Sequence, residues 1–179
     1  MPSVGHDGRR LCTNKCFKMN NDKKMLVAYF SATCTTMEAA SRLARIVGAD
    51  LHEIVPETLY SPADLNWNDP RSRSSVEMAD VCSRPAIASK VYNMEQYDIL
   101  FIGFPIWWYI APKIINTFLE QYNLVGKIIV PFFTSGGSGA GSTLEHLRPS
   151  APYSKWSAPK NFNHLSTEEI KSWVDSLEL

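Results

Sequence analysis

Residues 24–48, KMLVAYFSATCTTMEAASRLARIVG, join a short apolar run, a turn of small hydroxylated residues and an amphipathic segment. The continuous apolar run 24–30 is typical of a buried parallel strand. Apolar residues from Met37 to Val47 recur on one helical face, and Gly48 supplies a stop. The stretch therefore predicts a strand followed directly by a helix.

The same alternation continues along the chain. One long segment, 56–96, is too long for a plain connection, and we expect it to hold one helix within 68–81, capped by Asn68 or Asp69. The other predicted strands are 50–55, 98–105, 126–135 and one short strand within 150–162, and the other predicted helices are 112–122, 143–148 and 166–179. The last helix opens with a capping box, Ser166 with Glu169. Strands that alternate with helices indicate an α/β fold, a parallel sheet covered on both faces.

Composition and charge restrict the classes of function that the chain could have. The chain has 179 residues, of which 45% are hydrophobic, enough for one domain of ordinary size. Residues 1–23 carry five Lys or Arg against two Asp or Glu, and we expect a disordered polar arm there, followed by one domain over 24–179. There is no basic stripe for nucleic acid and no apolar run of about 20 residues that could span a membrane. The default location is the cytoplasm.

Residue types that commonly carry catalysis or bind metals are sparse. The four cysteines, at 12, 16, 34 and 82, do not form two metal-binding pairs, so we expect no metal. His52, His146 and His164 are isolated along the chain and are expected at the surface. We therefore predict no catalytic residue.

The loop after the first predicted strand is rich in hydroxyl groups. Four Ser or Thr residues fall within 31–36, more than a helix cap needs. The first N–H groups of a helix lack partners, and the helix dipole favours negative charge there. The loop is not a P-loop, because it lacks the glycines and the lysine. A phosphate site is thus one interpretation of the loop, and a simple helix N-cap is the other.

Two further loops should lie at the same sheet edge, because parallel strands point their carboxyl ends the same way. The segment 103–112, GFPIWWYIAP, places three consecutive aromatic residues on a loop stiffened by two prolines, which favours a stacking wall for a planar ligand. The segment 134–142, TSGGSGAGS, lets backbone N–H groups approach a ligand closely. A phosphate cradle, an aromatic wall and a glycine-rich loop together fit FMN.

With these three loops the sequence resembles the flavodoxin family over roughly residues 24–179. SATCTT is similar to the family's Ser/Thr-x-Thr-Gly-x-Thr phosphate loop, and GFPIWW and TSGGSGAGS complete the likeness. The resemblance implies a three-layer sandwich with a five-stranded parallel sheet in the order 2-1-3-4-5. Cys34 stands where the family has glycine, and a positive φ there would carry a penalty of about 1 kcal/mol.

Carried over by position, the resemblance implies FMN contacts from all three loops. The phosphate would be held by Ser31, Ala32, Thr33, Cys34, Thr35 and Thr36. The ring would be held by Pro105, Ile106, Trp107, Trp108 and Tyr109 and by Ser135, Gly136, Gly137, Ser138 and Gly139. Tyr60 or Trp67 could reach over the edge of the flavin.

The expected function is that of an FMN-binding flavodoxin, an electron carrier between redox proteins, a reductase and an acceptor. An alternative with the same fold is an FMN-dependent NAD(P)H oxidoreductase of the quinone reductase type. A third is a flavodoxin-fold binding protein without flavin. The sequence leaves open whether the chain is an enzyme. It also leaves open whether the chain forms a homodimer through an exposed sheet edge near residues 148–165.

Overall fold

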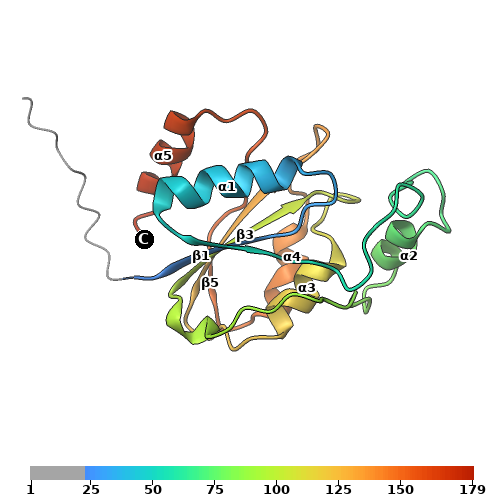
Figure 1. Cartoon of the computed structure of the whole chain (residues 1–179), viewed down its shortest axis with the longest axis horizontal. Helices are drawn as coiled ribbons and strands as arrows, with labels where there is room; N and C mark the ends of the chain where they lie inside the picture. Colours follow the sequence, from blue (N-terminus) through green and yellow to red (C-terminus); the bar gives the residue numbers. More distant parts are fainter. Residues whose placement is uncertain (1–22) are drawn as a thin grey trace, which may run out of the picture.

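The computed structural model describes residues 23–179, and the predicted arm 1–23 lies outside them except for Lys23. Its centre is a parallel sheet in the order β2-β1-β3-β4-β5, which confirms the α/β fold and the sheet order that the resemblance implied. Helices cover both faces of this sheet (Figure 1). The strands are β1 Met25–Tyr29, β2 Asp50–Glu53, β3 Ile99–Pro105, β4 Ile128–Thr134, β5 Lys155–Trp156 and β6 Lys160–Asn161.

The last strand position differs from the expected single short strand. It is divided into β5 and β6, which both pair with β4 in parallel. β5 pairs with residues 128–129 and β6 with residues 132–133, so Pro131 of β4 lies between the two paired stretches. Pro159 lies between β5 and β6. Because proline has no N–H to give to a ladder, the two prolines account for the interruption.

Five α-helices appear in the described part of the chain, with α1 and α5 on one face of the sheet and α3 and α4 on the other (Figure 1). They are α1 Thr35–Val47, α2 Arg73–Ala79, α3 Lys113–Glu120, α4 Thr143–Leu147 and α5 Thr167–Ser176, with short 3₁₀ helices at Met94–Gln96 and Arg148–Ser150. The predicted capping box of α5 is confirmed, since Ser166 Oγ accepts from the Glu169 N–H and the Glu169 carboxylate accepts from the Ser166 N–H.

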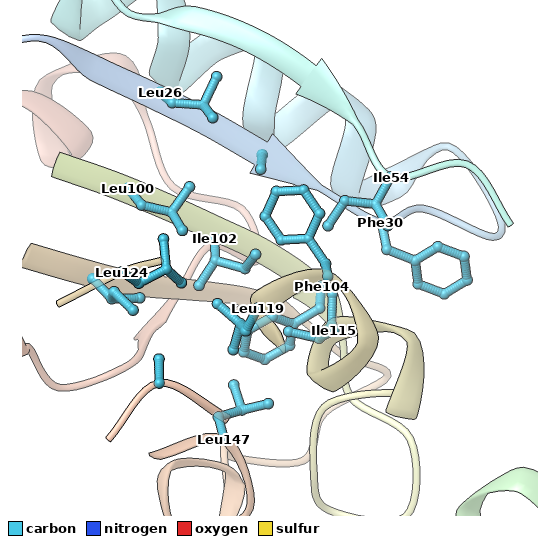
Figure 2. Close-up of a cluster of buried hydrophobic side chains, with 14 of the residues drawn as sticks. Leu26, Phe30, Ile54, Leu100, Ile102, Phe104, Ile115, Leu119, Leu124 and Leu147 are labelled. Atoms are coloured by element: carbon cyan, nitrogen blue, oxygen red, sulfur yellow. The ribbon is translucent and has the colours of Figure 1, made fainter. Parts of the chain in front are cut away.

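Successive residues of the central strands point to opposite faces of the sheet and belong to two hydrophobic cores. Leu100 and Ile102 of β3 point to the α3 face, where Leu26, Ile115 and Leu119 join them (Figure 2). Ile99 and Phe101 point to the α1 and α5 face. This alternation follows from the two-residue period of a strand. The central strands are therefore rigid supports for the loops at their carboxyl ends.

The segment 56–96 holds α2, as predicted, but its cap was predicted wrongly. The N-cap is Ser72, whose side chain accepts from the Ser75 N–H, and not Asn68 or Asp69. Asp69 instead accepts from the Arg71 N–H in a local turn. α2 lies beyond the carboxyl ends of the strands, at the right of Figure 1. The segment thus lies beside the loops that were predicted to bind a ligand.

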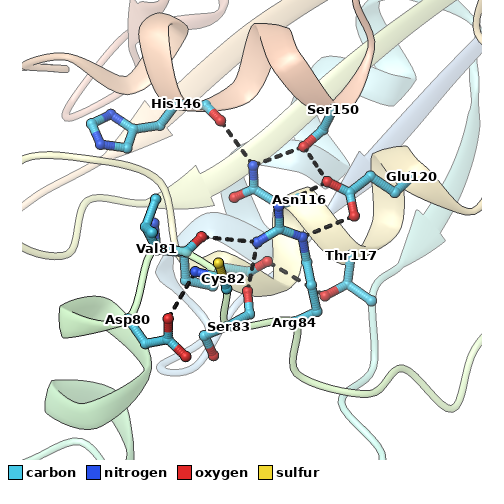
Figure 3. A network of polar contacts seen from close by, with 11 residues as sticks. Asp80, Val81, Cys82, Ser83, Arg84, Asn116, Thr117, Glu120, His146 and Ser150 are labelled. Carbon is cyan, nitrogen blue, oxygen red and sulfur yellow. Dashed lines mark hydrogen bonds and ion pairs between the residues drawn. The ribbon is translucent and has the colours of Figure 1, made fainter.

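An ion pair fastens the second half of this segment to α3. Arg84 Nε and Nη2 donate to the two carboxylate oxygens of Glu120, at 2.8 and 2.9 Å (Figure 3). Ser150 donates to the same carboxylate at 2.7 Å and accepts from Asn116 at 2.9 Å. The Arg84 hydrogen bonds lower the pKa of Glu120. This network connects residues 84, 116, 120 and 150 across three elements.

His52 is partly buried, whereas a surface position was predicted. Its ring stacks on Phe118 with centroids 5.9 Å apart, and its Nε2 is buried without a hydrogen-bond partner. Burial lowers its pKa. His164 is exposed, as predicted, and His146 is partly buried. Within residues 23–179, no helix has the length and apolar character to cross a membrane.

Candidate functional site

The three loops singled out in the sequence meet at the carboxyl edge of the sheet. The hydroxyls of Thr36 and Thr134 lie 2.8 Å apart and join the first loop to the end of β4. The Ile106 N–H donates to the Thr134 carbonyl at 2.9 Å, which joins β4 to the aromatic loop, residues 105–110. The fold therefore brings together residues that are about 70 and 100 positions apart in sequence.

The hydroxyl groups of the first loop have different surroundings. Ser31 Oγ accepts from the Met37 N–H at 3.2 Å, and Thr36 is 1% exposed with its hydroxyl already paired. Thr33 and Thr35 are exposed, with the N-terminus of the 13-residue helix α1 at Thr35. Two of the four predicted hydroxyls thus hold the loop together, and two face solvent beside the first N–H groups of the helix.

Cys34 caps this helix in the left-handed region, with φ 66° and ψ −14°. Its side chain makes no capping hydrogen bond, and the residue is exposed. A non-glycine residue in this region costs about 1–2 kcal/mol. The backbone conformation is therefore one that glycine adopts without strain, while cysteine carries the cost.

The aromatic loop is a two-residue reverse turn. Trp107 and Ile110 exchange both backbone hydrogen bonds, at 2.9 and 3.0 Å, and the two residues between them have positive φ values: Trp108 46° and Tyr109 64°. Positive φ at both central positions is the pattern of a type I′ turn, which normally takes Asn-Gly. Trp108 is 44% exposed and Tyr109 68% exposed. The strained turn thus displays two aromatic side chains at the strand end, a type of strain that is common at functional sites.

The glycine-rich loop, residues 135–141, closes on itself and on the aromatic loop. Ser135 Oγ donates to the Ser138 carbonyl at 2.6 Å, and Asn163 exchanges hydrogen bonds with the Ser135 backbone. A Cβ added at Gly141 would lie 2.1 Å from the Tyr109 carbonyl oxygen, so only glycine permits this approach. By contrast, a Cβ added at Gly136, Gly137 or Gly139 would meet no atom within 4 Å, so open space lies beside this loop.

A cavity of about 470 Å³ adjoins the aromatic loop on the side of α2. It brings together residues from the hydroxyl loop, the aromatic loop and the segment 56–96. The lining residues are Ala32, Thr33, Leu65, Trp67, Ser74, Pro105, Ile106, Trp107, Trp108 and Tyr109. Seven of these were predicted site residues, whereas residues 135–139 do not line the cavity.

Leu65 and Ser74 are cavity residues that sequence reasoning missed, and Trp67 was named there only as one that could reach over the flavin. Ser74 is one of three serines in the run 72–75, and nothing in that pattern distinguishes it. Asp64 accepts the Ser74 N–H at its backbone carbonyl, at 3.0 Å, which folds residues 64 and 74 together. Their position at the site follows from this tertiary contact.

Tyr60 connects α2 to the aromatic loop. Its ring lies 5.4 Å from the Trp107 ring and 5.7 Å from the Phe30 ring, and the Arg73 guanidinium lies 4.1 Å from its centroid. Its hydroxyl donates to Glu77 at 2.5 Å. Burial, followed by this hydrogen bond, raises the pKa of Tyr60. The phenol therefore stays protonated and acts as a fixed support.

This arrangement of strand-end loops can be compared with known families. The model of a flavodoxin family matches residues 24–177, nearly all of the described chain. The chain belongs to the flavodoxin family. No curated protein matches this flavodoxin-family chain at a significant level.

Solved structures agree with the family. A candidate flavoprotein from Bacteroides eggerthii is 49% identical with a TM-score of 0.85, over 88% of this chain and 99% of that one. A second, from Bacteroides uniformis, is 46% identical with a TM-score of 0.81, over 86% and 98%. A flavoprotein from Lactobacillus acidophilus in complex with FMN is 22% identical with a TM-score of 0.68, over 88% and 99%. Because the Lactobacillus protein is only 22% identical to this chain, its comparison supports the fold alone.

Proposed function

We propose that this flavodoxin-family chain binds FMN and carries electrons between redox proteins, a reductase and an acceptor. The observation that carries the proposal is the meeting of the hydroxyl loop, the aromatic loop and the glycine-rich loop at one sheet edge, linked through Thr134. The structurally similar Lactobacillus protein was crystallised with FMN, which adds support.

The residues of the first loop fit the phosphate of FMN. Thr33 and Thr35 offer exposed hydroxyls, and the first N–H groups of α1 add donors and the positive end of the helix dipole. No cation is needed, because donors and dipole together stabilise an anion. Cys34 lies in the same loop and is exposed. Its backbone has the left-handed conformation that the family's glycine would adopt.

The ring of FMN fits between the aromatic loop and the glycine-rich loop. Trp108 and Tyr109 offer exposed aromatic surface, and the open space beside Gly136, Gly137 and Gly139 leaves room for a ligand. When bound, FMN supplies the redox chemistry, and the protein supplies binding, orientation and the local electrostatic environment. Uncharged aromatic surroundings disfavour negative charge on the ring and so lower its potential.

Replacement of Thr33 and Thr35 by Val tests the phosphate site. We expect FMN affinity to fall about a hundredfold or more, because each of the two lost hydrogen bonds to a charged group is worth about 1.5–3 kcal/mol. Flavin fluorescence on titration of apoprotein measures this affinity. Thr117→Val, on α3, is the matched control. Unchanged affinity in the double variant contradicts the phosphate assignment, and no binding by the wild-type chain favours a flavodoxin-fold protein without flavin.

A second candidate, an FMN-dependent NAD(P)H oxidoreductase, is favoured by the exposed aromatic surface of Trp108 and Tyr109, because such an enzyme needs an open flavin face for its substrates. The absorption spectrum of the FMN-loaded protein separates the two. Bleaching by NADPH alone, followed by turnover with a quinone, favours the oxidoreductase. Reduction by dithionite but not by NADPH favours the carrier.

A further inference from the structure

Two rings outside the aromatic loop hold Trp107 in place. The Trp107 ring lies 5.6 Å from the Phe30 ring and 5.4 Å from the Tyr60 ring, in both cases edge to face. Phe30 is 1% exposed and its N–H donates to the Gly103 carbonyl at 2.9 Å, so the sheet fixes this ring. Tyr60 belongs to the segment 56–96, and its position depends on contacts with α2.

Two residues of α2 fix the position of Tyr60. Glu77 accepts from the Tyr60 hydroxyl at 2.5 Å and from Arg73 Nε at 2.7 Å. The Arg73 guanidinium lies 4.1 Å from the centre of the Tyr60 ring and donates to the Thr58 carbonyl at 2.7 Å. The side chains of Arg73 and Glu77 are only 24% and 13% exposed. Tyr60, Arg73 and Glu77 thus form one connected unit, the α2 triad.

The largely buried ion pair of the α2 triad contributes more to geometry than to stability. Two charges lose hydration when they are covered, and apolar residues of similar volume are often at least as stable. A charged pair nevertheless tolerates few arrangements, because each charge needs its partner at hydrogen-bond distance. The hydrogen bonds to Glu77 therefore restrict Tyr60 to one position against Trp107.

The turn that follows Trp107 needs such support. Trp108 and Tyr109 both have positive φ values, which carry a steric cost for residues with a Cβ. Strained conformations persist only where the surrounding structure fixes them. The two hydrogen bonds that close the turn join Trp107 to Ile110, so they depend on where Trp107 lies. The contact of Tyr60 with Trp107 is thus one of the constraints that maintain the turn.

We propose that the α2 triad is a positioning unit that sets the conformation of the aromatic loop and thereby controls the affinity for FMN. None of its three residues lines the cavity beside the aromatic loop, so they act through Trp107. By linkage, FMN must favour the intact triad by the same factor by which the triad favours FMN. The effect on the loop stands without the flavin, whereas the effect on affinity rests on the proposed function.

Hydrogen exchange of the full chain without FMN tests the effect on the loop. The N–H groups of Trp107 and Ile110 report on the turn, because each donates to the carbonyl of the other residue. Tyr60→Phe keeps the ring and removes the hydroxyl, and it should speed the exchange of both groups about fivefold or more. Glu77→Gln should act in the same direction. Unchanged exchange in Tyr60→Phe overturns the proposal.

Glu120→Gln is the matched control for these variants. It removes the charge that pairs with Arg84 at 2.8 Å, on the last residue of α3, at the end of that helix away from the aromatic loop. A general loss of stability speeds exchange in every segment, and this control measures that contribution. Exchange at Trp107 and Ile110 should therefore stay close to wild type. Equal acceleration in Glu120→Gln and Tyr60→Phe overturns the proposal, because a positioning role requires a local effect.

Titration of the apoprotein with FMN tests the effect on affinity. Tyr60→Phe should weaken FMN binding about fivefold or more, while Glu120→Gln should bind as wild type does. In the wild-type chain, FMN should slow exchange of the Val76 and Asp80 N–H groups of α2 by a similar factor. Wild-type affinity in Tyr60→Phe, or exchange at α2 that FMN leaves unchanged, overturns the control of affinity by the triad.

A wild-type chain that binds no FMN gives a different result. It contradicts the proposed function, and with it the control of affinity. The exchange rates of the apoprotein still decide whether the α2 triad sets the conformation of the aromatic loop.

Discussion

The hydroxyl oxygens of Thr36 and Thr134 lie 2.8 Å apart, and both residues are buried, with exposed fractions of 1% and 5%. The pair joins the first turn of α1 to the last residue of β4. Because the hydroxyl loop precedes Thr36 and the glycine-rich loop follows Thr134, one hydrogen bond sets the distance between two loops of the candidate site. Its role is structural, whereas Thr33 and Thr35 are free to bind.

Thr36→Val should lower the free energy of unfolding by about 1–3 kcal/mol, because it leaves the Thr134 hydroxyl buried and unpaired. The double variant Thr36→Val with Thr134→Val should lie close to wild type, since both polar groups are then replaced by methyl groups of similar shape. Urea unfolding measures both variants. A double variant as unstable as the sum of its single variants would show that the hydrogen bond is not the source of the effect.

Cys34→Gly should raise the free energy of unfolding by about 1 kcal/mol, because glycine adopts the observed φ of 66° without the steric cost of a Cβ. Cys34→Ala keeps the Cβ and removes the thiol, so it should match wild type. Thermal unfolding in reducing buffer compares the three chains. Equal stability of the Gly and Ala variants would mean that the backbone strain at this position is negligible.

The position of the hydroxyl loop was predictable from the sequence, but the role of each hydroxyl was not. Four Ser and Thr residues in six positions indicated an anion site. Which of them face solvent depends on where α1 begins. A start at Thr35 turns Thr36 toward β4, 98 residues away in sequence, and no local pattern contains that partner.

Replacement of Trp108-Tyr109 by Asn-Gly should stabilise the fold by about 1 kcal/mol and weaken FMN binding. Asn-Gly is the preferred pair for a type I′ turn, while the native pair holds two positive φ values at a steric cost. Urea unfolding and flavin titration measure the two effects. Gains in both stability and affinity would contradict the view that the strained turn is kept to present aromatic surface.

The alternation of strands and helices specified the sheet, because its central strands β1, β3 and β4 are short apolar runs that are buried on both faces. Local signals were weaker where the chain is held by side-chain contacts between distant segments. The segment 56–96 shows this best: Ser74 reaches the cavity through its backbone bond to Asp64, and Arg84 anchors the segment on Glu120. The split between β5 and β6 depends on Pro131 of the neighbouring strand as well as on Pro159.

His52 should make stability depend on pH between neutral and mildly acidic conditions. Burial lowers its pKa below the ordinary value of 6.5, so the unfolded chain takes up a proton first. The contribution of neutral His52 is therefore complete above pH 6.5 and is lost as pH falls through the lowered folded pKa. His52→Phe keeps a ring against Phe118 without a titrating nitrogen, so urea unfolding between pH 5 and about 7 should show a flatter profile. His164→Asn, at an exposed histidine, should keep the wild-type dependence of the free energy of unfolding on pH. An equally flat profile in this control would mean that His52 is not the source of the pH dependence.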